Sequence, residues 1–263
     1  LRDCNFSGCD LGGADLGGAD VSGTRWEGAN LRGARLDGVR ATGVRFEGVT
    51  FREARLEQAD LRQAAFVGCD FQGAMLRRSS LVSASFEVSD LASANLAECD
   101  LSAAKLEGVN LTMAHLEKAK LARTILTGAN LSGACLLEAD LNGAQLSNVD
   151  MSRATAPGIR LTGATLQSVN GRSADLSDSD LSDAAFLGVQ FVRASFRGAR
   201  MLRLRASKAD FEFADFRSAN LLECDFRKAS LIGVAFGDTK GVQCDFTEAD
   251  FFRAEMAGLE LIR

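Results

Sequence analysis

The chain has 263 residues, of which 30 are basic and 35 acidic, so its formal net charge at pH 7 is −5. Both signs are spread along the chain, which argues against a basic patch for nucleic acid and against an acidic tail. No apolar run is long enough to cross a bilayer, and no signal-peptide pattern is present. We therefore expect a soluble, cytoplasmic protein with no membrane contact and no direct nucleic-acid binding.

A large apolar residue recurs at every fifth position of the chain. This register runs from Leu1 to Leu261 without insertion or deletion, and 48 of its 53 central positions carry Leu, Phe, Met, Val or Trp. The residue two places before the central one is usually small, and the residue directly before it is often Asp or Asn. The repeating unit is therefore A-(D/N)-L-x-x, and a fixed period of this kind is typical of a repeat architecture.

A period of five fits neither an α-helix at 3.6 residues per turn nor a flat strand at 2.0. The backbone must therefore turn a corner once per unit if the central residue and the small residue before it are both to point inward. Aromatic residues also recur at a spacing of 20, as at Phe6, Trp26, Phe46, Phe66 and Phe86. This longer spacing spans four units, so it predicts a coil with four sides, on which equivalent residues of successive coils are stacked.

Residues 1–50 carry glycine two places after the central residue in nine successive units, from Gly8 to Gly48. Glycine at a corner permits the positive φ that some tight turns require. The constant spacing and the lack of a following helix favour this structural role over a phosphate-binding loop. Residues 51–150 keep the register most regularly.

The first irregular stretch is residues 154–173. It contains the only proline, Pro157, and replaces large central residues by Ala156 and Gly171, while Ile159 occupies a position that usually holds alanine. We expect a local distortion or bend here. A lid or a binding notch and a simple irregularity of the repeat are both compatible with this pattern.

From residue 187 onward, apolar side chains occupy positions that should point to solvent. We predict that they form an exposed stripe that binds a partner, since contiguous exposed apolar surface usually marks an interface. The alternative is that a register shift after Gly171 turns some of them inward. The stripe comprises Leu202, Leu222, Val242 and Ile262 on one face and Val192, Phe213, Ile232 and Phe252 on another.

The A-(D/N)-L-x-x pattern resembles the pentapeptide-repeat family, and the resemblance covers the whole chain. It implies an all-β fold, a right-handed quadrilateral β-helix, with about 13 coils for this length. We expect one domain over residues 1–263, irregular near 154–173. Neither end of the sequence carries a polar cap, so we expect the chain to be a segment of a longer protein.

Residues for catalysis or metal binding are scarce. His115 is the only histidine and sits in a repeat position, tyrosine is absent, and six of the seven cysteines occupy the small inward position. Cys224 and Cys244 hold equivalent positions in successive coils and should lie near enough to pair, although their position explains them without a disulfide. We predict a protein that is not an enzyme, with no catalytic residue, no metal site and no cofactor.

Two functions follow from these observations. In the first, the chain is a rigid non-catalytic scaffold that binds a protein partner, or itself, through the apolar stripe. In the second, it resembles family members that mimic duplex DNA and bind type II topoisomerases. The candidate face for mimicry carries no positive charge in one column of stacked residues, where the acidic members are Asp10, Asp70, Asp90 and Asp150.

Overall fold

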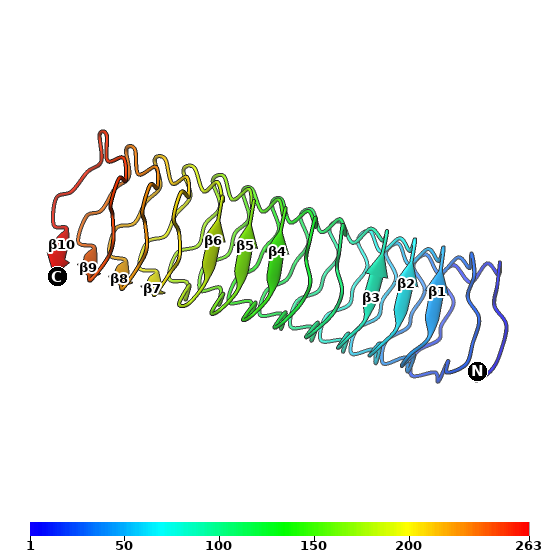
Figure 1. The fold of residues 1–263 in the computed structure, drawn as a ribbon. Coiled ribbons are helices and arrows are strands. Elements are labelled where there is room, and N and C mark those ends of the chain that lie inside the picture. The colour runs from blue at the N-terminus through cyan, green and yellow to red at the C-terminus, as the bar shows by residue number, and fades with distance from the viewer. Residues whose placement is uncertain (263) are drawn as a thin grey trace. The chain divides into compact units, whose positions relative to one another are not determined.

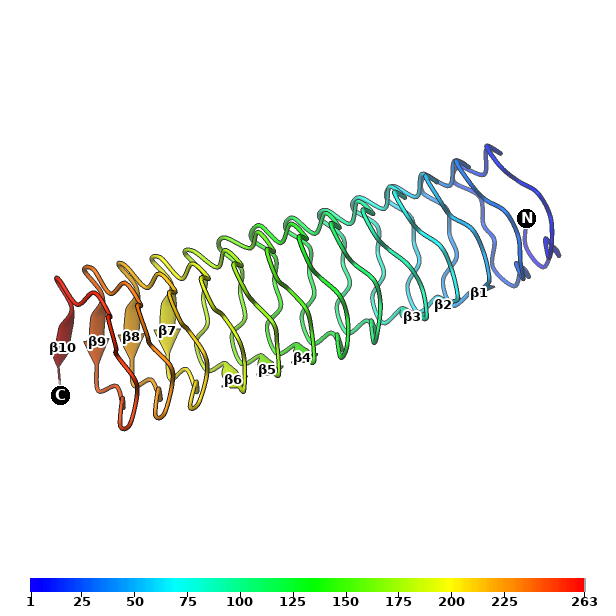
Figure 2. The same ribbon diagram turned by 90° about the horizontal axis from the view of Figure 1, so that it is seen from above.

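The computed structural model describes residues 1–262, which contain strands and turns and no helix. The chain divides into two compact units, Leu1–Cys135 and Leu136–Arg263. Within each unit the backbone winds in successive coils that lie side by side (Figures 1 and 2). The fold is thus the predicted β-solenoid, whereas the single domain over residues 1–263 stays a prediction.

The structure contains ten strands of three residues each within residues 1–262. Their bounds are β1 Arg45–Glu47, β2 Ala65–Val67, β3 Ser85–Glu87, β4 Gln145–Ser147, β5 Thr165–Gln167, β6 Ala185–Leu187, β7 Arg200–Leu202, β8 Asn220–Leu222, β9 Lys240–Val242 and β10 Glu260–Ile262. They form three parallel sheets in the orders β1-β2-β3, β4-β5-β6 and β10-β9-β8-β7.

Every pairing joins a residue to its equivalent one coil later. Phe46 lies beside Phe66 in β1 and β2, and single bridges such as that between Asn5 and Arg25 continue the same register outside the strands. This confirms the predicted spacing and hence the four sides of each coil. The two units together contain about 11 turns, whereas about 13 were predicted. The buried apolar residues run only from Val21 to Phe236, so the first and last coils lack a fully buried core.

The Asp or Asn before each central residue stabilises the corner that follows. The N–H of Gly12 donates to Oδ1 of Asp10 at 3.1 Å. The N–H of Ala14 then donates to the carbonyl of Leu11 at 3.0 Å, which closes a four-residue turn. The third residue of that turn, Gly13, has a φ of 68°. Because a turn of this type needs φ above zero at its third residue, the predicted role of glycine at the corner is confirmed.

The central and small positions form the core of each unit. Rings stack from coil to coil, with centroid distances of 5.2 Å between Phe46 and Phe66 and 4.8 Å between Phe66 and Phe86. The central residues and the small residues two places before them are buried, as at Leu106 and Ala104. The hydrophobic effect on these two inward positions per unit therefore holds the coils closed.

The distortion expected at residues 154–173 does not appear in the backbone pairing. The bridges continue from Thr155 to Asp175 and from Arg160 to Asp180, and the carbonyl of Pro157 accepts the N–H of Glu138 at 2.9 Å. Proline fits because at this corner position it contributes a carbonyl and needs no N–H. The irregularity is confined to side-chain packing inside the coil.

Leu106 gives a direct test of the inward position. Its side chain is buried in the regular part of the first unit. We expect Leu106→Ala to lower the free energy of unfolding by about 2–5 kcal/mol, as truncation of buried leucine does elsewhere. Chemical denaturation followed by circular dichroism measures it, with the exposed Met113→Ala as the matched control. A loss below about 0.5 kcal/mol, the scale of surface substitutions, would contradict an inward Leu106.

Candidate interaction surface

The outer face of the sheet β7–β10 carries a column of aliphatic side chains. In β7 and β8 the middle residue is buried, so that Met201 points inward while Arg200 and Leu202 face outward. Parallel pairing places the last residues of the four strands next to one another in register. We call this column the apolar ladder, and it consists of Leu202, Leu222, Val242 and Ile262.

The apolar ladder lies partly open to solvent. Its first three side chains are half-buried and Ile262 is 59% exposed. A hollow of about 220 Å³ opens on the same face, lined by Arg200, Met201, Leu202, Asn220 and Leu222. The hollow could receive an apolar side chain from another molecule.

The other two sheets have no such column. The corresponding outward residues are Glu47, Val67 and Glu87 in β1–β3, and Ser147, Gln167 and Leu187 in β4–β6. Among the ten strands of residues 1–262, only β7–β10 present aliphatic side chains at every step. The sequence pattern identified these positions, because the register of the coil alone places them in one column.

Charged and polar residues run beside the apolar ladder. The first residues of β7–β10 form a parallel column of Arg200, Asn220, Lys240 and Glu260. All four are exposed. The charge along this column therefore changes from positive at β7 to negative at β10.

The remaining residues of the predicted stripe do not join the apolar ladder. Val192, Ile232 and Phe252 occupy a column shifted by two units, which is half of the coil and hence the opposite side. Val192 is only 8% exposed, so its predicted exposure is wrong. The eight predicted residues thus lie on two faces of the coil, since Val192 and Leu202 are two units apart.

The two exposed phenylalanines on that opposite side contact arginines of the same chain. Phe213 is 50% exposed, and its ring centroid lies 6.0 Å from the guanidinium carbon of Arg193. Phe252 is 61% exposed, with the guanidinium carbon of Arg253 at 5.1 Å. Cation–π contacts of this kind stabilise exposed rings modestly.

The candidate acidic residues lie in their predicted columns within each unit. Asp10 pairs with Asn30, Asp70 with Asp90, and Asp150 with Asn170. One oxygen of each carboxylate accepts the corner N–H two residues on, at 2.9–3.1 Å. These carboxylates thus already have a structural role, and the Asp70 carboxylate also forms an ion pair with Arg52.

Negative charge nevertheless gathers on this side of the first unit. This side is made up of one segment from each coil, namely residues 7–13, 27–33, 47–53, 67–73, 87–93, 107–113 and 127–133. These segments contain two basic residues, Arg32 and Arg52, and each of them pairs with a carboxylate of the next segment. The segments contain eight acidic residues, namely Asp10, Glu27, Glu47, Glu53, Asp70, Glu87, Asp90 and Glu107. We call this side the acidic face.

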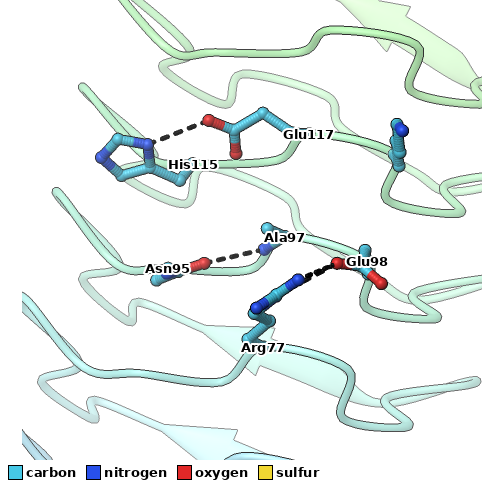
Figure 3. A pocket seen from close by; sticks show the side chains of 7 residues that line it. Arg77, Asn95, Ala97, Glu98, His115 and Glu117 are labelled. Atoms are coloured by element: carbon cyan, nitrogen blue, oxygen red, sulfur yellow. Dashed lines mark hydrogen bonds and ion pairs between the residues drawn. The ribbon is translucent and has the colours of Figure 1, made fainter.

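A pocket of about 350 Å³ in the first unit is lined by His115, the only histidine, and by Asn95, Glu98 and Glu117 among others. Figure 3 shows these side chains. His115 Nδ1 lies 3.1 Å from Oε1 of Glu117, and Glu98 accepts from Arg77 Nε at 3.1 Å and from Arg78 Nε at 2.8 Å. The Glu98 carboxylate thus pairs with two arginines of the preceding coil, which suits stabilisation of the two neighbouring coils. The sequence reasoning missed the pairing of Arg77 with Glu98; their separation by one coil and one further position was the available signal.

The arginines strongly affect the ionisation of Glu98. Hydrogen bonds from Arg78 and then Arg77 lower the pKa of Glu98 to about 2. Because the pKa in the fold lies below that of the unfolded chain, the pairing stabilises the fold above pH about 4.5, and the contribution is lost as pH falls toward 2. NMR titration of the Glu98 carboxyl should show this low pKa, and Arg78→Ala should raise it. A midpoint near 4.5 in both proteins would contradict the pairing.

Residues 1–262 contain no group of three or more His, Cys, Asp or Glu side chains arranged to hold a metal ion. Over the same range no helix could span a bilayer.

Comparisons with known proteins agree with the solenoid. A profile of the pentapeptide repeat region matches residues 39–116, and a profile of pentapeptide repeats matches residues 1–20, 14–52, 124–163, 144–183, 174–212 and 209–240. No curated protein matches the sequence.

Three solved structures illustrate the similarity. HetL, a pentapeptide repeat protein of the cyanobacterium Nostoc sp., is 27% identical over 88% of both chains, with a TM-score of 0.32. A pentapeptide repeat protein of the Arabidopsis thaliana thylakoid lumen is 26% identical over 54% of this chain and 70% of its own, with a TM-score of 0.30. QnrB1, a plasmid-mediated fluoroquinolone resistance protein, is 20% identical over 88% of this chain and 90% of its own, with a TM-score of 0.28. Since the two profiles cover well over half of its length, the chain belongs to the pentapeptide repeat family.

Proposed function

We propose that the chain is a non-catalytic protein-interaction module that associates through the apolar ladder. The observation that supports this most is the uninterrupted column from Leu202 to Ile262 on the outer face of a parallel sheet. Parallel sheets usually have both faces covered, and contiguous exposed apolar surface usually marks an interface. A partner that covers the apolar ladder would remove its half-buried side chains from water.

The partner that we propose is a second copy of the same chain. A two-fold axis along the strands, midway between β8 and β9, would place Leu222 opposite Val242 of the second copy. The same operation would place Arg200 opposite Glu260 and bring Asn220 to Lys240. In this arrangement the order of the coils is reversed between the two copies, so that β7 of one faces β10 of the other. The column beside the apolar ladder is positive at β7 and negative at β10, so opposite charges meet, and the two-fold axis repeats this contact.

A charge in the middle of the apolar ladder should prevent this association. We expect Leu222→Glu to give a monomer, since two carboxylates would be desolvated near the two-fold axis. Leu187→Glu is the matched control, because Leu187 is exposed on β6 and lies outside the apolar ladder.

Light scattering reports the mass and circular dichroism the fold of both variants. The proposal requires that the control associates like the parent chain. Equal association of the Leu222→Glu protein would rule out the apolar ladder as the interface, and capture of a different protein by a monomeric parent chain would overturn the choice of partner.

A second candidate function is mimicry of DNA toward a type II topoisomerase. The acidic face favours it, because its segments contain eight acidic and two basic residues, and a third basic residue, Arg45, pairs with Glu47 at their edge, which leaves a net charge of −5 on this side of the first unit. A field of one sign steers partners of the opposite sign.

A supercoiling assay tests this second candidate. The parent chain should inhibit the topoisomerase, and Glu87→Lys with Glu107→Lys should abolish inhibition. The same two charge changes at Glu57 and at the exposed Asp178, which lie outside the acidic face, serve as the control. No inhibition by the parent chain would reject this function.

We further propose that the protein is not an enzyme, uses no cofactor, does not bind nucleic acid directly and resides in the cytoplasm. Pairing of the polar groups around His115 and the structural role of the aspartates support the first of these.

A further inference from the structure

Cys224 and Cys244 are stacked on adjacent coils of the second unit. Parallel pairing joins Leu222 to Val242 before them and Asp225 to Asp245 directly after them. No other two of the seven cysteines hold equivalent positions in successive coils. The fold therefore brings this one pair of thiols together.

The spacing of the two coils suits a disulfide. Neighbouring strands lie about 4.7–4.9 Å apart, which falls within the roughly 4.4–6.8 Å that separates the Cα atoms of bonded cysteines. The backbones of the two coils are paired in parallel at Asp225 and Asp245. In agreement with this, the rings of Phe226 and Phe246 are stacked, with a centroid distance of 5.2 Å and an interplanar angle of 4°. The spacing of the paired backbones is thus compatible with a disulfide between these two residues.

The two thiols differ in their surroundings. Cys224 is buried and its Sγ lies 2.9 Å from the carbonyl oxygen of Met201, whereas Cys244 is half-buried. A hydrogen bond from the Cys224 thiol lowers the pKa of Cys244, and the same contact with burial raises the pKa of Cys224. By contrast, burial raises the pKa of Cys69 to about 11 and that of Cys99 to about 12. Thiolate character favours attack, so Cys244 is the better nucleophile.

We propose that Cys224 and Cys244 form an oxidisable dithiol, a modification site for hydroperoxides. The Cys244 thiolate attacks the outer oxygen of the hydroperoxide, the O–O bond breaks, and the alkoxide leaves with the proton of the former thiol as an alcohol. The Cys224 sulfur then attacks the sulfur of the resulting sulfenic acid. The S–O bond breaks, hydroxide takes the Cys224 proton and leaves as water, and the two thiols are oxidised while the hydroperoxide is reduced.

The disulfide would lie two residues past Leu222 and Val242, and it would tie β8 to β9. The proposal does not depend on self-association, because its measurements concern the sulfur atoms alone. Its success or failure therefore leaves the function of the apolar ladder to be tested separately.

The experiment treats the chain with hydrogen peroxide in a background of Cys4→Ser, Cys9→Ser and Cys135→Ser, which removes the other thiols that are not fully buried. Mass spectrometry of the digest should show a peptide pair joined through Cys224 and Cys244, which reductant separates. Cys224→Ser, which keeps a hydrogen-bond donor but cannot form a disulfide, should instead leave Cys244 as a sulfenic acid that dimedone labels, while Cys69 and Cys99 stay unlabelled.

The joined peptides and the dimedone label on Cys244 together support the proposal. It is overturned if circular dichroism shows an intact fold and the oxidised chain contains no joined pair, or if dimedone labels Cys69 or Cys99 as readily as Cys244.

Discussion

Phe211→Ala is expected to lower the free energy of unfolding of the second unit by about 3–5 kcal/mol, the range for truncation of buried phenylalanine. The side chain is fully buried, and its ring lies within 5.3–6.5 Å, between centroids, of five other rings. These rings belong to Phe186, Phe191, Phe196, Phe216 and Phe226. Removal would leave a cavity that neighbouring coils cannot close, because their register fixes the backbone around it.

Phe213→Ala is the matched control for this substitution. It removes the same ring two residues later, where the side chain is half exposed at a corner. We expect a loss within about 1 kcal/mol, since the substitution removes little buried surface and one cation–π contact. Guanidinium denaturation of both variants measures the difference, and equal losses would contradict the placement of the two rings.

Gly171→Leu should destabilise the protein although it restores the repeat. A Cβ atom at this position would lie 2.0 Å from the ring of Phe191, which occupies the space that a central leucine fills elsewhere. We expect a loss of about 1–3 kcal/mol, the usual cost of overpacking a core. Thermal and chemical denaturation measure it.

A second substitution tests the reason for this loss. Phe191→Leu combined with Gly171→Leu should regain part of the stability, because the smaller side chain gives space to the new leucine. A double-mutant cycle should therefore show a favourable coupling. A stabilising effect of Gly171→Leu alone would show that Phe191 does not fill the site.

The fold could be predicted from the sequence because two periods determine it. The shorter period of five sets the corners, and the aromatic spacing of 20 sets the number of sides. The period could not predict how neighbouring side chains pack where a central position lacks a large residue. The loss of a large residue at Gly171 suggested a bend, whereas the ring of Phe191 fills the space and the backbone pairing continues.

The candidate site could be predicted only in part. The spacing of 20 gave the apolar ladder from Leu202 to Ile262, because pairing in register follows from the repeat. Burial of Val192 could not be read from its position, since that depends on how neighbouring side chains cover it. The acidic positions and the flanking Arg52 were also found, but not the corner N–H groups that already engage the carboxylates.

The most direct test of the proposed association is sedimentation equilibrium of charge-reversed chains. We expect the parent chain, of 27.9 kDa, to associate into dimers, and Arg200→Glu or Glu260→Arg alone to weaken the dimer. The double variant should associate like the parent chain, because each reversed charge then meets its opposite in the second copy. A parent chain that stays monomeric, or a double variant weaker than both single ones, would contradict pairing of two copies through the apolar ladder.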